Sequence, residues 1–407
     1  MAGRLFIVSD LYYPEDSTTG HYMTGIAEGL AGNRHVDVIC GQPKYCQRGL
    51  RAPRQELRNG VNIYRCRGTT FDKNVYPLKM VNMLSLTLPI FFTGLFKICS
   101  GDVVLVVTTP PLLPFVVSMA CRLRGARCIL CIHDVYPEAM VYAGVLKRGR
   151  FIEHLLGWMT KRLYQRVDRI VVLGRDMARL VRAKTRNKDK VVVITNWADT
   201  DTVTPEPRGD NVLLTQLGLK DKFVVGYAGN IGPLQDIENL LQVALSLRNE
   251  SEVHFLFIGT GKKAPWLARA VKDSAMSNVT LLGQKPRSER NNFLNACDVA
   301  LISLVPGMAG VGVPSRMYNI LAAGKSIIAV TDADSETAMV VQEEKVGWVV
   351  PPGQPGALSE RIREAKASPD CLAEMGRRGR VVAETKYSRE SILGRYTALI
   401  ASLEGNL

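Results

Sequence analysis

The sequence has no paired cysteine motif of the kind that holds a metal or builds a disulfide framework. Its nine cysteines are scattered, and its one C-x-x-C, formed by Cys128 and Cys131, lies inside an apolar run without a second pair. This argues against a zinc site and fits a reducing compartment. Residues 1–10 carry one arginine and a short apolar run, which predicts a first strand and no signal peptide.

Acidic residues are in the minority, and the imbalance is local. The net charge is +14, yet residues 1–200 hold 29 Lys and Arg against 15 Asp and Glu, whereas residues 201–407 hold 23 of each. A basic half fits an anionic membrane surface or an anionic acceptor. Nucleic acid is the alternative, but no helix-turn-helix, zinc-finger or RNA-binding aromatic pattern accompanies the charge. We therefore favour a membrane surface and expect no nucleic-acid partner.

Long apolar runs are also scarce. The most apolar segment, residues 80–97, is barely long enough to span a bilayer and is interrupted by Asn82, Ser85, Thr87 and Pro89. We expect a core helix of a first domain here. The alternative is a helix with one apolar face in the membrane interface or facing a lipid-linked acceptor. At 407 residues the chain is long enough for two domains with separate cores.

The first half opens as a doubly wound α/β domain. We expect a strand at 4–9, a turn-rich loop at 10–20, a helix from about 21 to 31 and a strand at 36–40, followed by a polar loop at 42–60. Ligands of such sheets lie at the carboxyl ends of the strands, so the end of the first loop should face a ligand. Gly20 there would either let a backbone approach a phosphate or sugar, or simply begin the helix.

A second candidate site in this half follows the strand expected at 128–132. It delivers His133, Asp134 and, slightly further on, Glu138. A histidine beside two carboxylates at a strand end is a place for acid–base or binding chemistry. The alternative is a histidine that only caps the next helix.

The second half repeats a strand, glycine loop and helix three times. Such loops can cradle phosphate groups with backbone amides. Each is weak alone, but several from one parallel sheet favour a nucleotide diphosphate. The loop residues are Gly229, Asn230 and Gln235, then Gly259, Gly261 and Lys262, and then Gly283 and Lys285 near a base.

The segment 310–324 is the organising feature of this half. A glycine-rich run enters Pro314, Ser315 and Arg316, and an apolar helix then ends at Gly324 before a buried strand at 326–330. Pro314 suits the first turn of a helix and Ser315 can cap its amides, which would form a cup for an anion. Arg316 adds a bidentate cation for phosphate oxygens. The alternative is an ordinary crossover with a structural arginine.

Two pairs of acidic residues resemble metal ligands. They are Asp199 with Asp201 and Asp332 with Asp334. One pair lies at a linker and one follows a strand, so we interpret both as loop residues and expect no metal.

With these residues in place, the chain resembles the retaining glycosyltransferases of family four, in the branch that builds bacterial surface polysaccharides. The resemblance covers nearly the whole chain. Each motif alone is only modest evidence, but the motifs in this order are specific to the family. They are Tyr13-Pro14-Glu15, Thr109-Pro110-Pro111, His133-Asp134-x-x-Pro137-Glu138, Tyr227 to Gly232 with Gln235, Gly259-x-Gly261, Val313 to Arg316 with Ala322-Ala323-Gly324, and Val350 to Gly353.

The resemblance implies the α/β GT-B fold, in which two Rossmann-like doubly wound domains face a central cleft. We expect an acceptor-side domain at 1–203, a donor-binding domain at 204–386, and a helix at 387–407 that crosses back to the first domain. It implies a nucleotide-diphosphate sugar as donor, no cofactor, and no required metal, because basic side chains and helix amides neutralise the leaving group. His133 would lie beside the donor sugar, and Arg316 stands where the branch usually has a diphosphate-binding lysine.

The chain departs from the family pattern at three positions. The wider family has two glutamates where this chain has Val311 and Asn319, and often an arginine where it has Asn230. Asn319 can still hydrogen-bond a ribose hydroxyl through its amide oxygen, but Val311 cannot replace a carboxylate. Arg316 would therefore carry more of the diphosphate charge, and no carboxylate nucleophile is evident for a double displacement.

The function expected from these observations is transfer of a hexose, deoxyhexose or N-acetylhexosamine to a lipid-linked saccharide, with retention, in O-antigen, capsule or exopolysaccharide synthesis. The enzyme would be cytoplasmic and peripheral on the inner membrane. His133 and Arg316 would be catalytic, Asp134 and Glu138 would orient the acceptor, and Ser315, Asn319 and the glycine loops would bind donor. Two alternatives stay open: a sugar-nucleotide epimerase of the same fold, and a catalytically impaired scaffold subunit.

Overall fold

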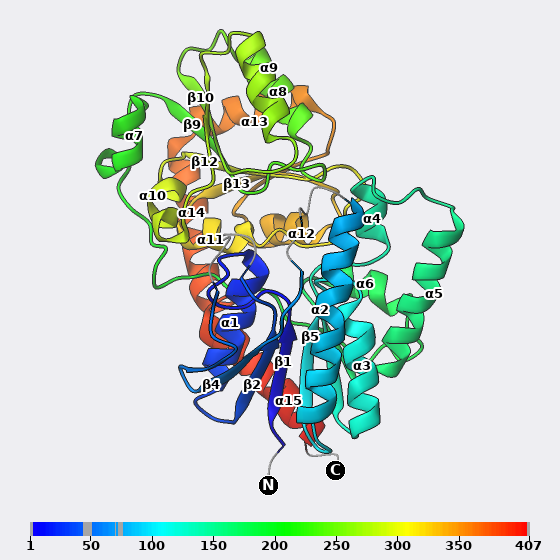
Figure 1. The fold of residues 1–407 in the computed structure, drawn as a ribbon. Coiled ribbons are helices and arrows are strands. Elements are labelled where there is room, and N and C mark those ends of the chain that lie inside the picture. The colour runs from blue at the N-terminus through cyan, green and yellow to red at the C-terminus, as the bar shows by residue number, and fades with distance from the viewer. Residues whose placement is uncertain (1–2, 44–50, 70, 72–75, 405–407) are drawn as a thin grey trace. The chain divides into compact units, whose positions relative to one another are not determined.

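The computed structural model describes residues 3–43, 51–69, 71 and 76–404. The chain forms two compact units (Figure 1). The first unit comprises the chain up to Pro137, Arg148–Thr195 and the segment from Ile392 onward. The second comprises Glu138–Lys147 and Asn196–Ser391. Each unit is built on one sheet with helices on both faces.

The first unit contains an eight-stranded sheet. Its strands are β1 (Leu5–Ser9), β2 (Val36–Cys40), β3 (Gln55–Arg58), β4 (Val61–Arg65), β5 (Val103–Val107), β6 (Arg127–Ile132), β7 (Arg169–Val172) and β8 (Val191–Val193). The strand order is β3-β4-β2-β1-β5-β6-β7-β8, and every pair is parallel except β3 with β4. Between β1 and β5 the order reverses, which is where such sheets bind ligands.

The helices of the first unit lie on both faces because right-handed crossovers in opposite directions fall on opposite sides. The helix between β1 and β2 lies on one face, where Leu393 of the last helix packs against Gly29. The helices that connect β4 to β8 lie on the other face. They are α1 (Thr18–Leu30) and α15 (Arg389–Glu404) on the first face, and α2 (Tyr76–Lys97), α3 (Leu113–Arg124), α5 (Phe151–Arg166) and α6 (Arg175–Arg182) on the second.

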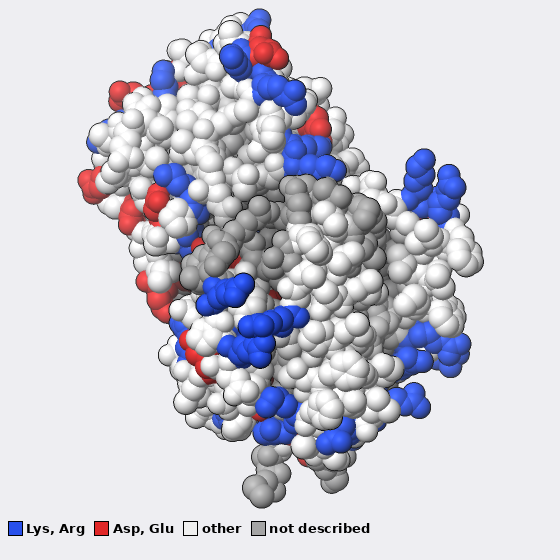
Figure 2. All heavy atoms as spheres, in the orientation of Figure 1, with Lys and Arg blue, Asp and Glu red and all other residues white. Residues whose placement is uncertain are grey.

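Helix α2 is the apolar segment identified in the sequence. Its 22 residues include Pro89 and bury Leu86 and Ile90 in the core. Among the described residues, no helix has both the length and the apolarity to cross a membrane. In Figure 2 the surface over α2 carries few charged side chains, and Lys and Arg lie along the margins of this unit.

The second unit contains a six-stranded, fully parallel sheet. Its strands are β9 (Phe223–Ala228), β10 (Val253–Ile258), β11 (Val279–Leu282), β12 (Val299–Ser303), β13 (Ser326–Val330) and β14 (Gly347–Val350). The order is β11-β10-β9-β12-β13-β14. The chain runs outward from β9 to β11 and then returns to place β12 beside β9, so the switch point lies between β9 and β12.

Two apolar cores cover the two faces of this sheet. Buried parallel strands are apolar on both sides, which is why these strands are continuous apolar runs in the sequence. The helices are α4 (Glu138–Tyr142), α7 (Val212–Leu217), α8 (Ile237–Ser246), α9 (Ala264–Asp273), α10 (Arg290–Asn295), α11 (Arg316–Ala322), α12 (Glu336–Glu343), α13 (Pro355–Ala367) and α14 (Pro369–Thr385), with short 3-10 turns at Arg208–Asp210 and Arg287–Glu289.

The expected fold class of two Rossmann-like α/β units is confirmed, and the last helix packs on the first unit, as expected. Two local predictions were wrong. The first helix begins at Thr18 rather than near residue 21, because Ser17 caps it by accepting from the Gly20 amide at 3.1 Å. The polar segment 42–60, of which residues 44–50 lie outside the described residues, is not all loop, because it contains the antiparallel edge strand β3.

Candidate active site

The glycine loops of the second unit meet at its switch point. Gly229 follows β9, and Gly259 and Gly261 follow the neighbouring strand β10. The two loops are tied together by backbone hydrogen bonds, from the Ile231 amide to the Thr260 carbonyl and from the Lys263 amide to the Ile231 carbonyl, both at 2.9 Å. The sheet therefore presents two interlocked loops where a ligand is expected.

Glycine is required in both loops. Gly229 and Gly259 have φ of 150° and 147°, where side chains are strained. A Cβ on Gly259 would lie 1.9 Å from the Gly229 carbonyl oxygen, and one on Gly261 would lie 2.4 Å from the Ile231 carbonyl oxygen. These glycines let the backbones of the two loops approach each other closely.

Arg316 lies directly over the first glycine loop. A Cβ on Gly229 would fall 2.6 Å from its Cζ, and the guanidinium lies 4.6 Å from the centre of the Tyr227 ring. The Tyr227 hydroxyl donates to the Asn230 carbonyl at 2.6 Å, which orients the ring. The Nη1 atom of Arg316 is buried and has no hydrogen-bond partner among the described residues. A buried, unpartnered guanidinium nitrogen is costly unless an anion completes it.

The start of α11 differs from the prediction. Ser315 is the N-cap residue, but its side chain makes no capping hydrogen bond, and Pro314 precedes the cap instead of standing in the first turn. The expectation that Ser315 caps the helix amides with its hydroxyl was wrong. The helix amides are therefore not occupied by this side chain.

The acidic pairs have structural partners. Asp332, after β13, accepts from the amides of Gly307 and Ala309 with its two carboxylate oxygens, each at 3.1 Å. Asp199 forms an ion pair with Arg290 and accepts from the Trp197 indole at 3.1 Å. Both residues hold loops, in agreement with their interpretation as loop residues.

Two of the three positions that depart from the family pattern, Val311 and Asn319, are buried. Val311 is 2% exposed, and its amide donates to the Met308 carbonyl at 3.0 Å. Asn319 is 7% exposed, and its amide oxygen accepts from the Asp199 amide at 3.0 Å. The oxygen that the sequence suggests for a ribose is thus engaged in holding the Asp199 loop.

The remaining predicted donor residues of this unit lie in the same loops or at the sheet edge. The Asn230 side-chain amide donates to Gln235 at 3.3 Å, across the turn that begins at Gly229. Lys262 is exposed, whereas the neighbouring Lys263 pairs with Glu238 at 2.6 Å. Gly283 follows the edge strand β11, and Lys285 pairs with Glu289 at 3.1 Å.

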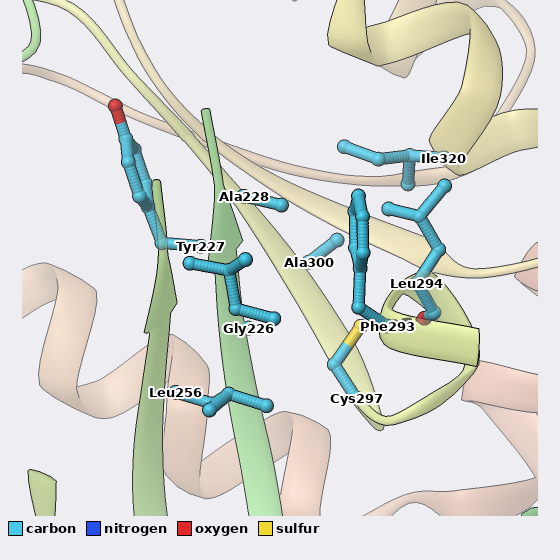
Figure 3. Close-up of a pocket in the computed structure, with 10 residues that line it drawn as sticks. Gly226, Tyr227, Ala228, Leu256, Phe293, Leu294, Cys297, Ala300 and Ile320 are labelled. Atoms are coloured by element: carbon cyan, nitrogen blue, oxygen red, sulfur yellow. Dashed lines mark hydrogen bonds between the residues drawn. The ribbon is translucent and has the colours of Figure 1, made fainter. Parts of the chain in front are cut away.

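A small pocket lies behind the first glycine loop (Figure 3). It is lined by Gly226 and Ala228 of β9, Phe293 and Leu294 of α10, and Ile320 of α11, with no charged side chain. The Tyr227 hydroxyl points away from the labelled apolar side chains. An apolar lining does not suit a diphosphate, so this pocket is not where an anion is expected to bind.

In the first unit, His133 is held at the end of β6 by two threonines. Its amide donates to the Thr108 hydroxyl at 3.1 Å, and its Nδ1 lies 3.3 Å from the Thr19 hydroxyl. Its Nε2 is buried without a hydrogen-bond partner among the described residues. Thr108 follows β5 and Thr19 belongs to α1, so three elements converge on one imidazole next to the switch point.

Burial sets the protonation of this site. Desolvation lowers the pKa of His133 from 6.5 to about 4 and raises the pKa of Asp134 from 3.8 to about 6. At neutral pH, His133 is therefore an uncharged imidazole, able to donate or accept one hydrogen bond but not to act as a cation. Asp134 is mostly ionised at pH 7 and takes a proton just below it.

Gly20 and Glu138 are the two remaining predicted residues of the first half of the chain. A Cβ on Gly20 would lie 2.5 Å from the Glu15 carbonyl oxygen, so close packing of the backbone explains this glycine. Glu138 begins α4 and belongs to the second unit, whereas His133 and Asp134 belong to the first. The second unit thus contains the glycine loops, Gln235 and Arg316, and the first contains Gly20, His133 and Asp134.

Sequence reasoning missed four residues of this arrangement. Thr19 and Thr108 orient His133, Tyr227 lies under Arg316, and Asp332 holds the loop before α11. Thr19 and Thr108 lie in segments that the sequence had already marked, so their hydroxyls at strand and helix ends were the available signal. Tyr227 begins a motif of the family resemblance, but an aromatic residue in a buried strand is ordinary and did not indicate a contact with Arg316.

The fold and the site define a class. Two parallel α/β units, one with an arginine over interlocked glycine loops at its switch point, have the GT-B architecture of sugar-transferring enzymes. A chain of Anabaena, Alr3699/HepE in complex with UDP-glucose, has this fold: the TM-score is 0.74 at 14% identity, covering 98% of this chain and 99% of that one. At that identity the likeness concerns the fold alone.

The sequence comparisons supply the family. Residues 17–197 match the model of a glycosyl transferase 4-like domain, and residues 222–367 match that of glycosyl transferases group 1. The "Probable glycosyltransferase WbjE" of Pseudomonas aeruginosa is 36% identical over 303 residues, 74% of this chain and 75% of that one. WcaI of Escherichia coli (strain K12), a glycosyl transferase named for colanic acid biosynthesis, is 25% identical over 97% of this chain and 98% of that one. The chain belongs to the family-four glycosyltransferases.

Proposed function

We propose that this glycosyltransferase moves a hexose, deoxyhexose or N-acetylhexosamine from a nucleotide-diphosphate sugar to a lipid-linked saccharide during synthesis of a bacterial surface polysaccharide. The observation that supports a nucleotide-diphosphate donor is the buried Nη1 atom of Arg316, which has no hydrogen-bond partner among the described residues. A diphosphate oxygen could accept a charge-assisted hydrogen bond from this atom. The name of WcaI and the UDP-glucose bound by HepE support the acceptor class and the donor class, respectively.

In this proposal the leaving diphosphate is stabilised by the Arg316 guanidinium and by backbone amides of the glycine loops. Such groups lower the barrier because they face the charge that develops as the glycosidic bond breaks. Neutral His133 hydrogen-bonds the transferred sugar, and Asp134 and Glu138 orient the attacking hydroxyl. Positive protein groups then do what a divalent ion does in other transferases, so we expect activity without a metal. Chelation with EDTA should leave turnover unchanged, and its loss would contradict this part.

The proposed stereochemistry is retention through attack from the face that the diphosphate leaves. A double displacement needs a positioned carboxylate nucleophile, and the position at which the family has a glutamate is the buried Val311. Proton NMR of the first product should show the donor's anomeric configuration. An inverted product would refute retention, and a trapped glycosyl-enzyme would refute the single step.

The decisive experiment for the donor is a thermal-shift panel of uridine, guanosine and thymidine diphosphate sugars. A ligand that binds only the folded state raises the melting temperature according to its affinity and concentration. We expect one base to stabilise the wild type and to stabilise Arg316→Gln far less. Incubation of that donor with and without a lipid-linked saccharide then tests transfer. An isomerised donor in the absence of acceptor would indicate an epimerase instead.

We place the enzyme at the cytoplasmic face of the inner membrane, where a lipid-linked acceptor is presented. The excess of Lys and Arg in residues 1–200 supports an anionic membrane surface as a partner of the first unit. Fractionation of cells should find the protein with membranes, and release by high salt or alkaline carbonate would distinguish peripheral from integral association.

A further inference from the structure

Helix α2 exposes an apolar stripe on the side opposite the core. Its exposed large apolar residues are spaced by three or four positions, so they lie on one face of the helix. Leu88, Phe92 and Phe96 are 57%, 52% and 79% exposed, while Leu86 and Ile90 on the other face are 1% exposed. A helix that is apolar all round is normally buried on every side. The exposed stripe is Val81, Leu84, Leu88, Phe92 and Phe96.

The stripe continues onto neighbouring helices of the same unit. Helix α3 packs against both α2 and α5. On α3, Met119 and Leu123 are exposed, and α5 adds a cluster of exposed aromatic and aliphatic side chains. Single exposed apolar residues need no explanation, but a contiguous set over three adjacent helices marks an interaction surface. The α5 cluster consists of Phe151, Ile152, Leu155 and Trp158.

The charges of these helices are almost all positive. Together α2, α3 and α5 contain seven Lys and Arg and one acidic residue, Glu153. Arg162 lies over the Trp158 ring, 5.3 Å from its centre. Figure 2 shows the surface over α2 as a broad uncharged area with Lys and Arg at its margin. The basic residues whose side chains the structure describes are Lys97, Arg122, Arg124, Lys161, Arg162 and Arg166.

We propose that this α2–α3–α5 face docks on an anionic lipid bilayer, with the apolar stripe in the acyl boundary and the basic residues among the headgroups. Apolar side chains flanked by cations and an amphipathic tryptophan match the layered chemistry of a membrane surface. No described helix can span a membrane, so the face lies in the interface. A symmetric contact between two copies would bring the same cations together and is disfavoured by like-charge repulsion.

Flotation of the full chain with vesicles of phosphatidylethanolamine and phosphatidylglycerol tests the proposal without donor or acceptor. The wild type should float with these vesicles and much less with phosphatidylcholine alone. High salt should weaken the binding without abolishing it, because salt screens the cations but not the buried stripe. Because neither substrate is present, the result is independent of the proposed sugar transfer.

The variant Leu88→Glu/Phe92→Glu should lower the partition coefficient by roughly tenfold or more, because burial of each side chain is strongly favourable. Both residues are exposed, so the fold should be retained, and circular dichroism checks it. The control is Val381→Glu, which changes an exposed apolar residue of the second unit (47% exposed) and should float like the wild type. Both variants should keep wild-type activity on a water-soluble acceptor analogue.

A second readout follows Trp158. Brominated lipids should quench its fluorescence when the vesicles bind, and Trp158→Phe should remove that quenching. Three results would overturn the proposal: wild-type flotation of Leu88→Glu/Phe92→Glu, complete loss of wild-type binding at high salt, or a wild-type dimer that this variant converts to monomer while vesicle binding is unchanged. The last would assign the face to a second copy of the chain.

Discussion

The guanidinium of Arg316 occupies the space that a side chain at Gly229 would fill, because a Cβ there would lie 2.6 Å from the arginine Cζ. Gly229 directly follows β9, and Arg316 begins α11 after the neighbouring strand β12. Because Gly229 has no side chain, there is room beside it for the Arg316 guanidinium, which comes from the helix after the neighbouring strand. This relationship leads to the first two predictions.

Gly229→Ala should weaken nucleoside diphosphate binding by roughly tenfold or more, since the methyl group displaces Arg316 and strains a backbone at φ 150°. Isothermal titration with the diphosphate found in the thermal-shift panel measures it. The control is Gly356→Ala in α13, where a Cβ meets nothing within 4 Å. Equal affinity for the Gly229 variant and the wild type would show that Arg316 does not bind the diphosphate from this position.

Arg316→Gln should lower kcat/KM by roughly 10- to 100-fold, the range expected for losing a hydrogen bond to a charged group. The kcat/KM of Arg316→Lys should lie between those of Arg316→Gln and the wild type, because lysine keeps the positive charge but lacks the planar guanidinium that can donate two parallel hydrogen bonds. Steady-state kinetics of transfer measures both. Arg361→Gln, which changes an exposed arginine of α13, should behave as the wild type. A wild-type rate for Arg316→Gln would remove the guanidinium from the mechanism.

His133 and Asp134 should make opposite contributions to stability below neutral pH. The folded state disfavours protonated His133, so its contribution to the free energy of unfolding rises as pH increases from about 4 to 6.5. Folding favours protonated Asp134, so its contribution falls as pH increases from about 4 to 6. Each is on the order of 3 kcal/mol at most, and in the wild type they largely cancel.

Single substitutions should separate the two contributions. His133→Asn leaves Asp134, so urea denaturation should show decreasing stability from pH 4 to 6. Asp134→Asn leaves His133, so stability should increase over the same interval. Parallel pH profiles for the two variants would show that burial does not set these two pKa values.

Asp332→Asn should loosen the loop that precedes α11. Asparagine has one acceptor oxygen where aspartate offers two, so either Gly307 or Ala309 loses its partner. We expect a loss of about 1–3 kcal/mol in the free energy of unfolding and a higher KM for the donor. Thermal denaturation and kinetics test both. The control is Asp273→Asn, at an exposed position of α9. Wild-type stability and donor KM for Asp332→Asn would show that Asp332 does not hold this loop.

The buried strands were predictable because a parallel strand covered on both faces is a continuous apolar run. The strands at 36–40 and 326–330 were placed with their observed bounds. β3 was missed because it is an edge strand, Gln55–Arg58, in which three of the four residues are polar and all are at least partly exposed. Its pairing with β4 depends on a neighbour that a local pattern does not contain.

In the candidate site too, some features could be predicted from the sequence and others could not. Gly229, Gly259, Gly261, Arg316 and His133 could be proposed from the sequence because strand carboxyl ends collect at one edge of a parallel sheet. The partners were not predictable from the sequence. The amide oxygen of Asn319 holds the Asp199 backbone, and the Ser315 hydroxyl leaves the helix amides uncapped. A polar side chain has several possible partners, and only the packed chain selects one.

The sequence by itself indicated the class of fold and the positions of the buried strands, because both depend on the local periodicity of apolar residues. It also indicated the glycine and arginine residues proposed for the donor site, because glycine permits backbone conformations and close approaches that other residues do not. Only the tertiary structure decided that Arg316 lies over Gly229, that burial keeps His133 neutral, and that one face of α2 is uncovered. Which residues lie close together and which are buried depends on contacts between segments that are distant in the chain. A local sequence pattern does not contain those contacts.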